Sequence, residues 1–366
     1  MAQMPAIVKS DTFSLNLKLN TQTRYLANWR SGAGPNDNFT HGFTSRRMRM
    51  ILEGNVLAPS TTYLVLWEWA RDASGPTLLD ATLRHRWASG FALSGGQLRP
   101  NFFREELMSH NSQLAAERSH LTPLFSVGYS HGIEAEYRDD ALRATATFSD
   151  GAASLNAPFG SSTAADWALT TRVDYAWTGG LAPWSQFTSF REGPLAAYSG
   201  AAFHIQSGGN TGVTRDRGLI TWTADSGLKG DGWNTFIAYA GRQVHERMGA
   251  TRGRFHDQGV FAQGGIFVSD RVELFARWEH IRPDPDRDAP GAAARTARPF
   301  HAWTPGLNFY IAPRSHVAKL TVDVVYVPTA TSGTSSIMSF PNTGTGVLPS
   351  SGRNQFVLRT QFQMMF

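Results

Sequence analysis

The most conspicuous absences in this sequence of 366 residues are cysteine, which does not occur, and lysine, which occurs only at positions 9, 18, 229 and 319. Without cysteine, disulfide scaffolds and thiol catalysis are excluded. Because lysine is scarce, arginine carries nearly all of the positive charge, and the formal net charge is +5. Guanidinium groups stay charged at any relevant pH and bind oxyanions in a planar fork. The charge composition therefore suits an anionic partner.

Long hydrophobic runs are also missing. A helix that crosses a bilayer needs about 20 consecutive apolar residues, and no stretch of the chain approaches that length. Residues 1–5 have neither the basic start nor the apolar run of a signal peptide, so for an exported protein we expect this numbering to begin at the mature end. Helical periodicity, a domain linker and short repeats are absent as well, which predicts a single domain over residues 1–366.

The sequence does contain strict alternation of apolar and polar residues, most clearly at its C-terminus, NQFVLRTQFQMMF. One parity holds Phe356, Leu358, Phe362, Met364 and Phe366, and the other holds Gln355, Arg359, Gln361 and Gln363. A period of two predicts a strand with one apolar face. Such a strand at a chain end must be held in a sheet, and a closed barrel holds it without leaving an edge.

The same alternation recurs in four further segments, at 12–25, 80–87, 167–177 and 316–327. Their lengths approach the nine to eleven residues that a tilted strand needs to cross a membrane. Short turns alternate with long segments at 30–42, 71–79, 101–125, 149–166, 207–217, 243–257, 282–299 and 328–353. One connection, 178–195, is long where a turn is expected.

This rhythm predicts an all-β fold, a transmembrane antiparallel β-barrel of about 16 strands with short periplasmic turns and long extracellular loops. The alternative is a pair of soluble β-sandwiches, whose strands also alternate.

Two stretches resemble the phosphate-selective porin O/P family of outer-membrane proteins. HGFTSRRMRMILEGNV (41–56) is similar to the paired-arginine second strand of that family. GQLRPNFFREELMSHNSQLAAERSHL (96–121) is similar to its fifth strand and third loop, through Gly96, Gln97, Leu98, Phe102 or Phe103, Glu105, Glu106, Glu117, Arg118 and Ser119. The resemblance implies a sixteen-stranded homotrimeric porin, an inward third loop at 101–125 that narrows the pore, and anion selectivity through basic residues lining the channel.

The chain departs from that family at the expected constriction. Specific phosphate members place lysines there, whereas residues 101–125 contain none. The cations available in this loop are Arg104, Arg118, His110 and His120, and they are balanced by Glu105, Glu106 and Glu117. General passage of small anions or neutral solutes is therefore the safer expectation.

In a barrel the polar parity faces the lumen, where fixed charge sets selectivity. The candidate pore-lining and anion-binding residues are Lys18, Arg47, Arg49, Arg84, Arg86, Arg104, Arg118, Arg172 and Arg359. The pairs Arg47/Arg49 and Arg84/Arg86 are the strongest candidates, because two like charges on one face cannot satisfy one another. The alternative is that acidic neighbours such as Glu134, Glu136, Asp174 and Asp323 neutralise the inward arginines across strands.

The outward parity carries a different set of residues. Arg46 falls on it and is expected at the membrane rim. Aromatic residues make up 12% of the chain, with eleven tryptophans; near predicted strand ends, Trp87, Trp167, Trp177 and Tyr326 are typical of interfacial girdles. Segment 61–70 is apolar on both faces apart from Glu68, which suits an interface between barrels.

Enzymatic and metal-binding motifs are missing from the sequence. The histidines are scattered, and the glycine-rich stretches lack the Gly-Lys-Ser/Thr of a phosphate loop. His204 and His256 are the only proposals for a barrel enzyme. The sequence thus predicts a non-enzymatic porin for passive diffusion, without cofactor, metal or nucleic acid, in the outer membrane of a Gram-negative-type cell and in contact with its lipid. The alternatives are a sugar or carboxylate channel, a barrel enzyme, and a barrel plugged by its loops.

Overall fold

The computed structural model describes residues 7–10, 12–32, 38–69, 75–209, 218–248, 251–285, 298–332 and 344–366. The strands are β1 (Val8–Lys9), β2 (Ser14–Trp29), β3 (Phe39–Val56), β4 (Ala58–Trp69), β5 (Thr77–Arg86), β6 (Phe91–Leu98), β7 (Ser130–Arg138), β8 (Leu142–Ser149), β9 (Ala165–Thr178), β10 (Ala196–Gly208), β11 (Gly218–Gly230), β12 (Trp233–Met248), β13 (Thr251–Phe267), β14 (Val272–Arg282), β15 (Phe300–Tyr310), β16 (Ala318–Val327) and β17 (Gln355–Met365). The short helices are α1 (Arg104–Leu107), η1 (His110–Ser112), α2 (Leu121–Phe125) and η2 (Ala182–Ser185).

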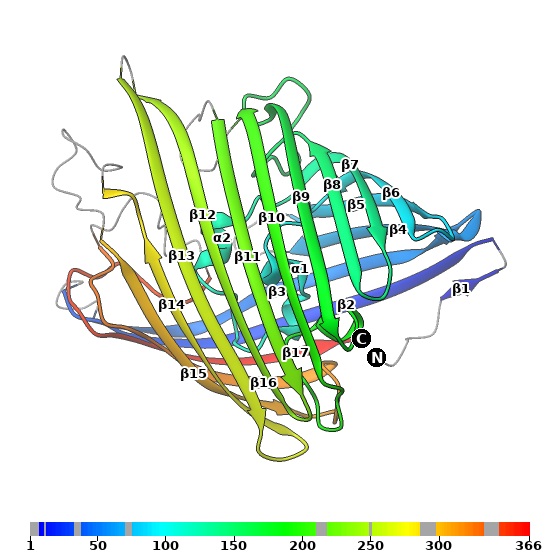
Figure 1. Ribbon diagram of the computed structural model, residues 1–366. Coiled ribbons are helices and arrows are strands. Elements are labelled where there is room, and N and C mark those ends of the chain that lie inside the picture. The colour runs from blue at the N-terminus through cyan, green and yellow to red at the C-terminus, as the bar shows by residue number, and fades with distance from the viewer. Residues whose placement is uncertain are drawn as a thin grey trace.

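These strands form one antiparallel sheet that closes on itself (Figure 1). Of its 17 strands, the two-residue β1 pairs only with β2, so sixteen strands, β2–β17, make the ring. Closure comes from β17, which pairs with β2, and the backbone amide of Phe366 donates to the carbonyl of Leu19 at 2.9 Å. The predicted sixteen-stranded barrel and the role of its last strand are confirmed.

The two faces of the wall differ as the alternation predicts. On β17, Arg359 and Gln361 are buried toward the lumen, whereas Phe356 and Phe362 are exposed on the outer surface. The aromatic residues expected at an interfacial girdle lie on the outer face at or near strand ends: Trp87, Trp167, Trp177 and Tyr326. The outer surface is therefore apolar and suited to lipid. Among the described helices, none is both long and apolar enough to cross a bilayer.

The ends of the barrel differ in their connections. At the turn end the links are mostly short, whereas the loop end carries the long ones, of which parts at 30–42, 71–79, 207–217, 282–299 and 328–353 lie outside the described residues. The prediction of a long loop at 243–257 was wrong, because β12 and β13 pair in unbroken register from Trp233↔Ile266 to Met248↔Thr251. On the lumenal face, Arg242 and Asp257 pair across these two strands at 3.1 Å. The polar residues that the sequence assigned to a loop therefore belong to the hairpin.

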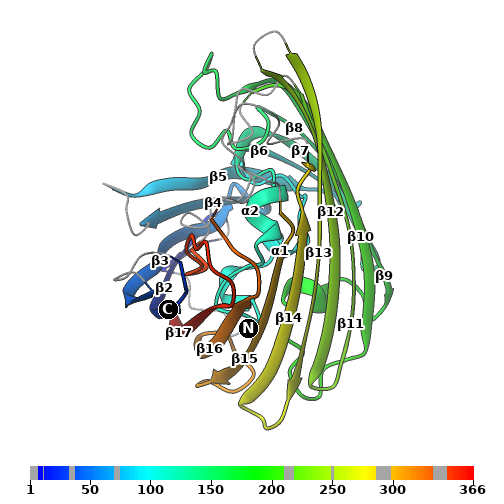
Figure 2. The same cartoon turned by 90° about the vertical axis from the view of Figure 1, so that its left-hand side faces the viewer.

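The main hydrophobic cluster lies inside the barrel. Figure 2 shows α1 and α2 enclosed between the wall of β3–β5 and the wall of β12–β14. Phe102, Phe103 and Leu121 of the loop after β6 are almost fully buried, and so are Trp184 and Phe187 of the connection after β9. Two segments that enter from opposite ends therefore fill much of the lumen, and they position the charged residues described next.

Candidate functional site

The predicted constriction loop, 101–125, does fold into the lumen; we call it the inward loop. Glu105 organises it, because its carboxylate accepts from the backbone amide of Ser119 at 2.9 and 3.0 Å and from the Thr122 hydroxyl at 2.6 Å. The same carboxylate pairs with Arg277 of β14 at 3.0 Å. The motif residues Glu105 and Ser119 thus bind one another and hold the loop to the far wall.

A second carboxylate in the inward loop, Glu117, collects three arginines. Arg46 Nε donates to it at 2.6 Å, Arg47 Nη2 at 2.6 Å, and Arg24 Nη2 at 3.3 Å. Burial alone would raise the pKa of Glu117, but the surrounding arginines hold it well below its ordinary range. Glu117 therefore stays ionised and joins the loop to β2 and β3.

The expected outward position of Arg46 was wrong. The pairing of β2 with β3 shifts register between Gln22 and Thr23, so that Gln22 faces Arg47 and Thr23 faces Ser45. An extra residue on one strand bends it locally and redirects side chains. The bulge turns Arg46 toward Glu117 beside Arg47, and the strict alternation of the sequence gives no sign of it.

Arg49 lies next to this group but has other partners. Its guanidinium pairs with Glu68 of β4 and contacts His110 Nδ1 at 2.8 Å. Burial and the neighbouring arginines lower the pKa of His110 well below its ordinary value. His110 is therefore neutral at physiological pH and does not act as one of the cations expected at the constriction.

Arg118 and Arg104, both in the inward loop, are held mainly by backbone carbonyls. Arg118 Nη2 donates to the carbonyls of Glu106 and Met108 at 3.1 and 3.0 Å, and burial together with nearby arginines lowers its pKa to about 10. Arg104 donates to the carbonyl of Trp184 and lies 3.5 Å from Asp174. Arg118 is therefore packed within the inward loop, whereas Arg104 joins the inward loop to the connection after β9.

Three other predicted residues are paired on the wall. Arg172 is bound by Asp174 at 2.6 Å and Asp225 at 2.8 Å. A Cβ at Gly200 would collide with this group, which explains the glycine there. The remaining two pairs are Arg359 with Asp323, at 2.5 Å, and Lys18 with Glu53.

Arg84 and Arg86 of β5 form the most exposed of the predicted clusters. Both lie 2.5 Å from Glu136 of β7, and Arg143 of β8 lies 2.8 Å from the same residue. Their side chains remain 27%, 38% and 19% exposed, respectively. Three guanidinium groups thus share one carboxylate on a water-accessible wall. We call Arg84, Arg86, Arg143 and Glu136 the arginine cluster.

A polar cavity of about 530 Å³ lies beside the arginine cluster in the half of the lumen bounded by β2–β7. Its lining includes Arg84 and Arg99 together with Glu53, Asp80 and Glu134. The other half of the lumen is packed with aromatic side chains. Open space in the described lumen is therefore found next to the exposed arginines.

The connection after β9, 179–195, is the feature that sequence reasoning left unexplained; we call it the turn-end segment. Lys229 of β11 donates to the carbonyls of Pro183, Gln186 and Thr188 at 2.8, 2.7 and 3.4 Å. Its Nζ also lies 4.5 Å from the centre of the Trp184 ring. A Trp and two Phe residues in a connection on the turn side were the available signal that this segment is buried.

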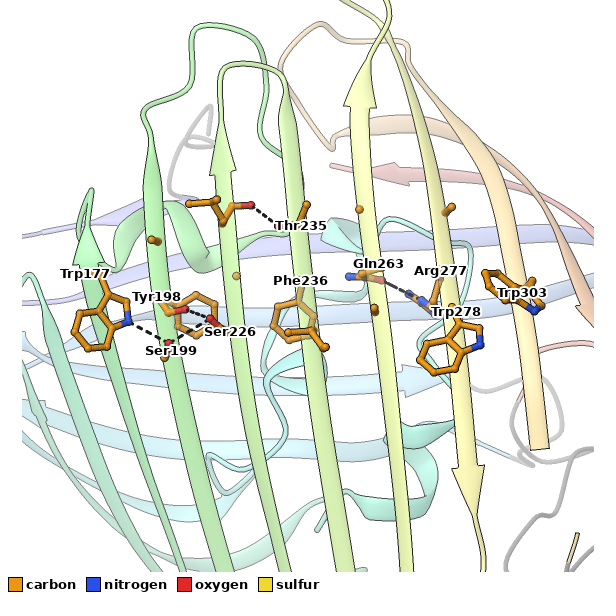
Figure 3. A pocket seen from close by; sticks show the side chains of 17 residues that line it. Trp177, Tyr198, Ser199, Ser226, Thr235, Phe236, Gln263, Arg277, Trp278 and Trp303 are labelled. Carbon is orange, nitrogen blue, oxygen red and sulfur yellow. Dashed lines mark hydrogen bonds between the residues drawn. The ribbon is translucent and has the colours of Figure 1, made fainter. Parts of the chain in front are cut away.

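A second hollow, of about 630 Å³, lies on the outer surface rather than in the lumen (Figure 3). Its rim includes Trp177 of β9 and Trp278 and Trp303 of β14 and β15, and small residues such as Ser199 and Gly264 lie between them. Trp177 Nε1 donates to Ser199 Oγ at 3.1 Å. This groove lies on the outer face of the wall and is separate from the lumen.

The two histidines named as enzyme candidates, His204 and His256, lie on opposite faces of the wall. His204 is buried against Thr170 and Gln206, and His256 is exposed on the outer face, where its ring packs on Trp222. A different arrangement, which the sequence did not reveal, joins Thr345, His120 and Glu279. His120 Nδ1 lies 2.5 Å from Glu279 Oε2, and its Nε2 lies 3.2 Å from Thr345 Oγ1.

All three of these side chains, Thr345, His120 and Glu279, are buried. None of them lines the polar cavity or the outer hollow. The described residues contain no group of three or more His, Asp or Glu that would hold a metal ion.

No protein-family model and no curated protein matches this chain. Solved structures do match its fold. The anion-selective porin from Comamonas acidovorans has a TM-score of 0.64 at 13% identity, over 97% of this chain and 100% of that one. The outer membrane channel DcaP of Acinetobacter baumannii gives 0.63 at 11%, over 99% and 100%. OprB of Pseudomonas putida gives 0.61 at 9%, over 96% and 94%. At these identities the likeness shows the outer-membrane barrel fold alone.

Proposed function

We propose that this chain is an outer-membrane channel for passive diffusion of small hydrophilic solutes, with a preference for anions. The closed ring with an apolar outer face and a charged lumen supports this function, because every backbone polar group of a barrel is paired within the sheet. The likeness to porin structures supports it as well. We place the turn end in the periplasm and the loop end outside the cell.

The single observation that carries the anion preference is the arginine cluster. Glu136 can neutralise only one of the three guanidinium groups around it, so the arginine cluster itself keeps excess positive charge, even though the adjoining cavity also carries Asp80 and Glu134. Fixed charge on a narrow, water-filled wall raises the local concentration of counter-ions. The predicted arginines Arg47, Arg49, Arg172 and Arg359 contribute less, because each is buried against a carboxylate.

Phosphate specificity, as in the O/P family, is a narrower hypothesis that we do not adopt. The inward loop has no lysine, and Glu105 and Glu117 balance the arginines around it. A carboxylate channel fits the same arginine cluster as a channel for inorganic anions. The closed barrel and its polar cavity support a sugar channel without explaining the excess of arginine.

We propose that the barrel carries out no catalysis and uses no cofactor. The observation that favours an enzyme is the contact of Thr345, His120 and Glu279, which resembles a nucleophile, a base and an orienting acid. The exposed fractions are 1%, 3% and 1%, and a nucleophile must reach its substrate. We therefore assign these residues to packing between the inward loop and the wall.

We propose a homotrimer. Strand β4 carries apolar residues on both faces, with Trp67 and Trp69 on the outer one and Leu64 and Leu66 on the inner one. An apolar outer face can contact either lipid or a neighbouring barrel. A structure of OmpT from Vibrio cholerae is a trimer form, which supports the second possibility. Cross-linking in native membranes tests this assembly.

The test of the channel is the reversal potential of the purified protein in a planar bilayer under a KCl gradient. We expect conductance with a reversal potential that indicates preference for chloride. Cation preference would contradict the role of the arginine cluster. Absence of conductance, together with hydrolysis of lipid or peptide, would contradict the channel itself.

A further inference from the structure

A small cavity of about 120 Å³ lies inside the turn end of the barrel, where the inward loop meets the turn-end segment. Arg104, Leu107 and Met108 come from the inward loop, and Leu181, Trp184 and Ser185 from the turn-end segment. The wall contributes Arg138, Arg143 and Asp174. The volume is enough for a few water molecules, since each occupies about 30 Å³ in the liquid. It therefore suits a compact solute.

The charge in this cavity is predominantly positive. Three arginines line it against one carboxylate, Asp174, and that carboxylate is already bound by Arg172 at 2.6 Å. Arg143 pairs with Glu136, whereas Arg138 has no carboxylate within ion-pair distance among the described residues. An anion entering here would therefore meet Arg138, a guanidinium group that no described carboxylate pairs with, next to two arginines that share their carboxylates with other arginines.

Two buried donors of the cavity-lining residues lack partners. Trp184 is 1% exposed and Arg104 is 7% exposed, yet within the described part of the chain neither Trp184 Nε1 nor Arg104 Nε has a hydrogen-bond partner. Buried donors without a partner are rare in folded proteins, so an acceptor bound in this cavity would complete the hydrogen bonding of these groups. The other contacts of Arg104, to Asp174 and to the Trp184 carbonyl, fix its position beside the cavity.

The remaining lining is apolar. Leu107, Met108 and Leu181 offer no hydrogen bond to a fully hydrated inorganic ion, which would lose its water against them. A molecule with one carboxylate and a short apolar part matches both kinds of wall: its oxygens accept from the arginines and the indole N–H, and its carbon chain lies against the aliphatic side chains.

We infer that this cavity is a binding site for a small organic monocarboxylate, held by Arg104, Arg138, Arg143 and the indole N–H of Trp184. The inference rests on the proposed function, because the lumen delivers the solute, and it names the class of solute that the channel favours. Sequence patterns did not indicate the site, since its two halves come from segments about 75 residues apart whose meeting depends on both folding inward.

The test is isothermal titration calorimetry of the detergent-solubilised full chain with propionate as the probe. We expect one site per chain. Arg138 is exposed, so Arg138→Gln should leave the fold intact. The substitution should weaken propionate binding about tenfold, the effect of one charge-assisted hydrogen bond. Trp184→Phe should also weaken binding while it keeps an aromatic ring against Tyr198. Arg191→Gln is the matched control. Arg191 lies on the turn-end segment, as Trp184 does, but it pairs with Asp270 outside the cavity.

Bilayer conductance of the same preparations separates the two proposals. Conductance without propionate binding overturns the site and leaves the channel, whereas binding without conductance overturns the channel and leaves the site. Tighter binding of phosphate than of propionate overturns the assigned class. If Arg191→Gln weakens propionate binding as much as Arg138→Gln does, the site does not lie in this cavity.

Discussion

Arg47 Nη2 of β3 lies 2.6 Å from Glu117 Oε1 of the inward loop, a contact between residues 70 positions apart in the chain. Arg24 and Arg46 reach the same carboxylate, so one acidic side chain joins the inward loop to β2 and β3. Buried charges are tolerated only when paired and hydrogen-bonded. These buried arginines therefore hold the inward loop in place, and the proposed anion preference rests on other arginines.

Replacing Glu117 with glutamine should destabilise the barrel at neutral pH by about 3–5 kcal/mol, because three arginines are left buried without their anion. The effect should depend on pH. The pKa of folded Glu117 lies well below its ordinary 4.5, so the stabilisation is complete above that value and is lost as the pH falls below it. The unfolding temperatures of the wild type and the variant, measured by circular dichroism, should therefore converge in acid.

Glu192→Gln is the control for that experiment. Glu192 also pairs with an arginine, Arg314, at 2.8 Å, but both side chains are exposed at the turn end. Exposed ion pairs contribute little to stability. If Glu192→Gln lowers the unfolding temperature as much as Glu117→Gln does, the importance of the buried group is refuted.

Lys229→Met should loosen the turn-end segment while keeping the length of the side chain. The carbonyls of Pro183 and Gln186 lose their ammonium donor, and an unsatisfied buried polar group costs about 1–3 kcal/mol. We expect larger and noisier single-channel conductance, because the segment then spends time out of the lumen. Lys18→Met is the comparison, since Lys18 pairs with Glu53 away from the segment. Unchanged conductance in Lys229→Met would mean that the segment does not limit the current.

The sequence predicted the wall well because each wall residue faces either lipid or lumen, which imposes a period of two on every strand. The alternation around Arg359 and Phe356 is the clearest case. Arg46 was misplaced because a one-residue bulge reverses parity without changing composition. Partners such as Glu117 for Arg47 escaped prediction because they depend on where a long loop lands across the lumen.

The sequence predicted the burial of the inward loop but not that of the turn-end segment. The inward loop was expected from its motif, and Glu105 and Ser119 of that motif are bound together in the fold. The turn-end segment carries Trp184 and Phe187 in a connection that faces no lipid, which is itself a sign of burial. The lumenal cavity forms only where the two segments meet, so no local sequence pattern predicts it.

Thr345→Ala tests whether the contact of Thr345 with His120 is catalytic. Because all three members of the group are buried, we expect the wild type to hydrolyse neither phospholipid nor peptide and the variant to conduct like the wild type. Hydrolysis by the wild type that disappears in Thr345→Ala, with conductance retained, would show instead that the barrel is an enzyme.

The selectivity test compares Arg84 and Arg86 with Arg47 and Arg49. In the sequence, each pair is two arginines two positions apart on the inward face of a strand. Arg84→Gln with Arg86→Gln should lower the chloride preference, because it removes two partly hydrated charges and leaves Arg143 to neutralise Glu136. A charge a few ångström from an ion in water is worth on the order of 1 kcal/mol, so the permeability ratio should fall about fivefold. The measurement is the reversal potential under a KCl gradient.

Arg47→Gln with Arg49→Gln should act differently, because those side chains are 6% and 10% exposed and pair with Glu117 and Glu68. Their loss uncouples the inward loop from β3, so conductance and stability should change more than the ratio of chloride to potassium permeability. The reverse pattern, with selectivity lost only in the Arg47 and Arg49 variant, would place the selective charges at the constriction and refute the role of the arginine cluster.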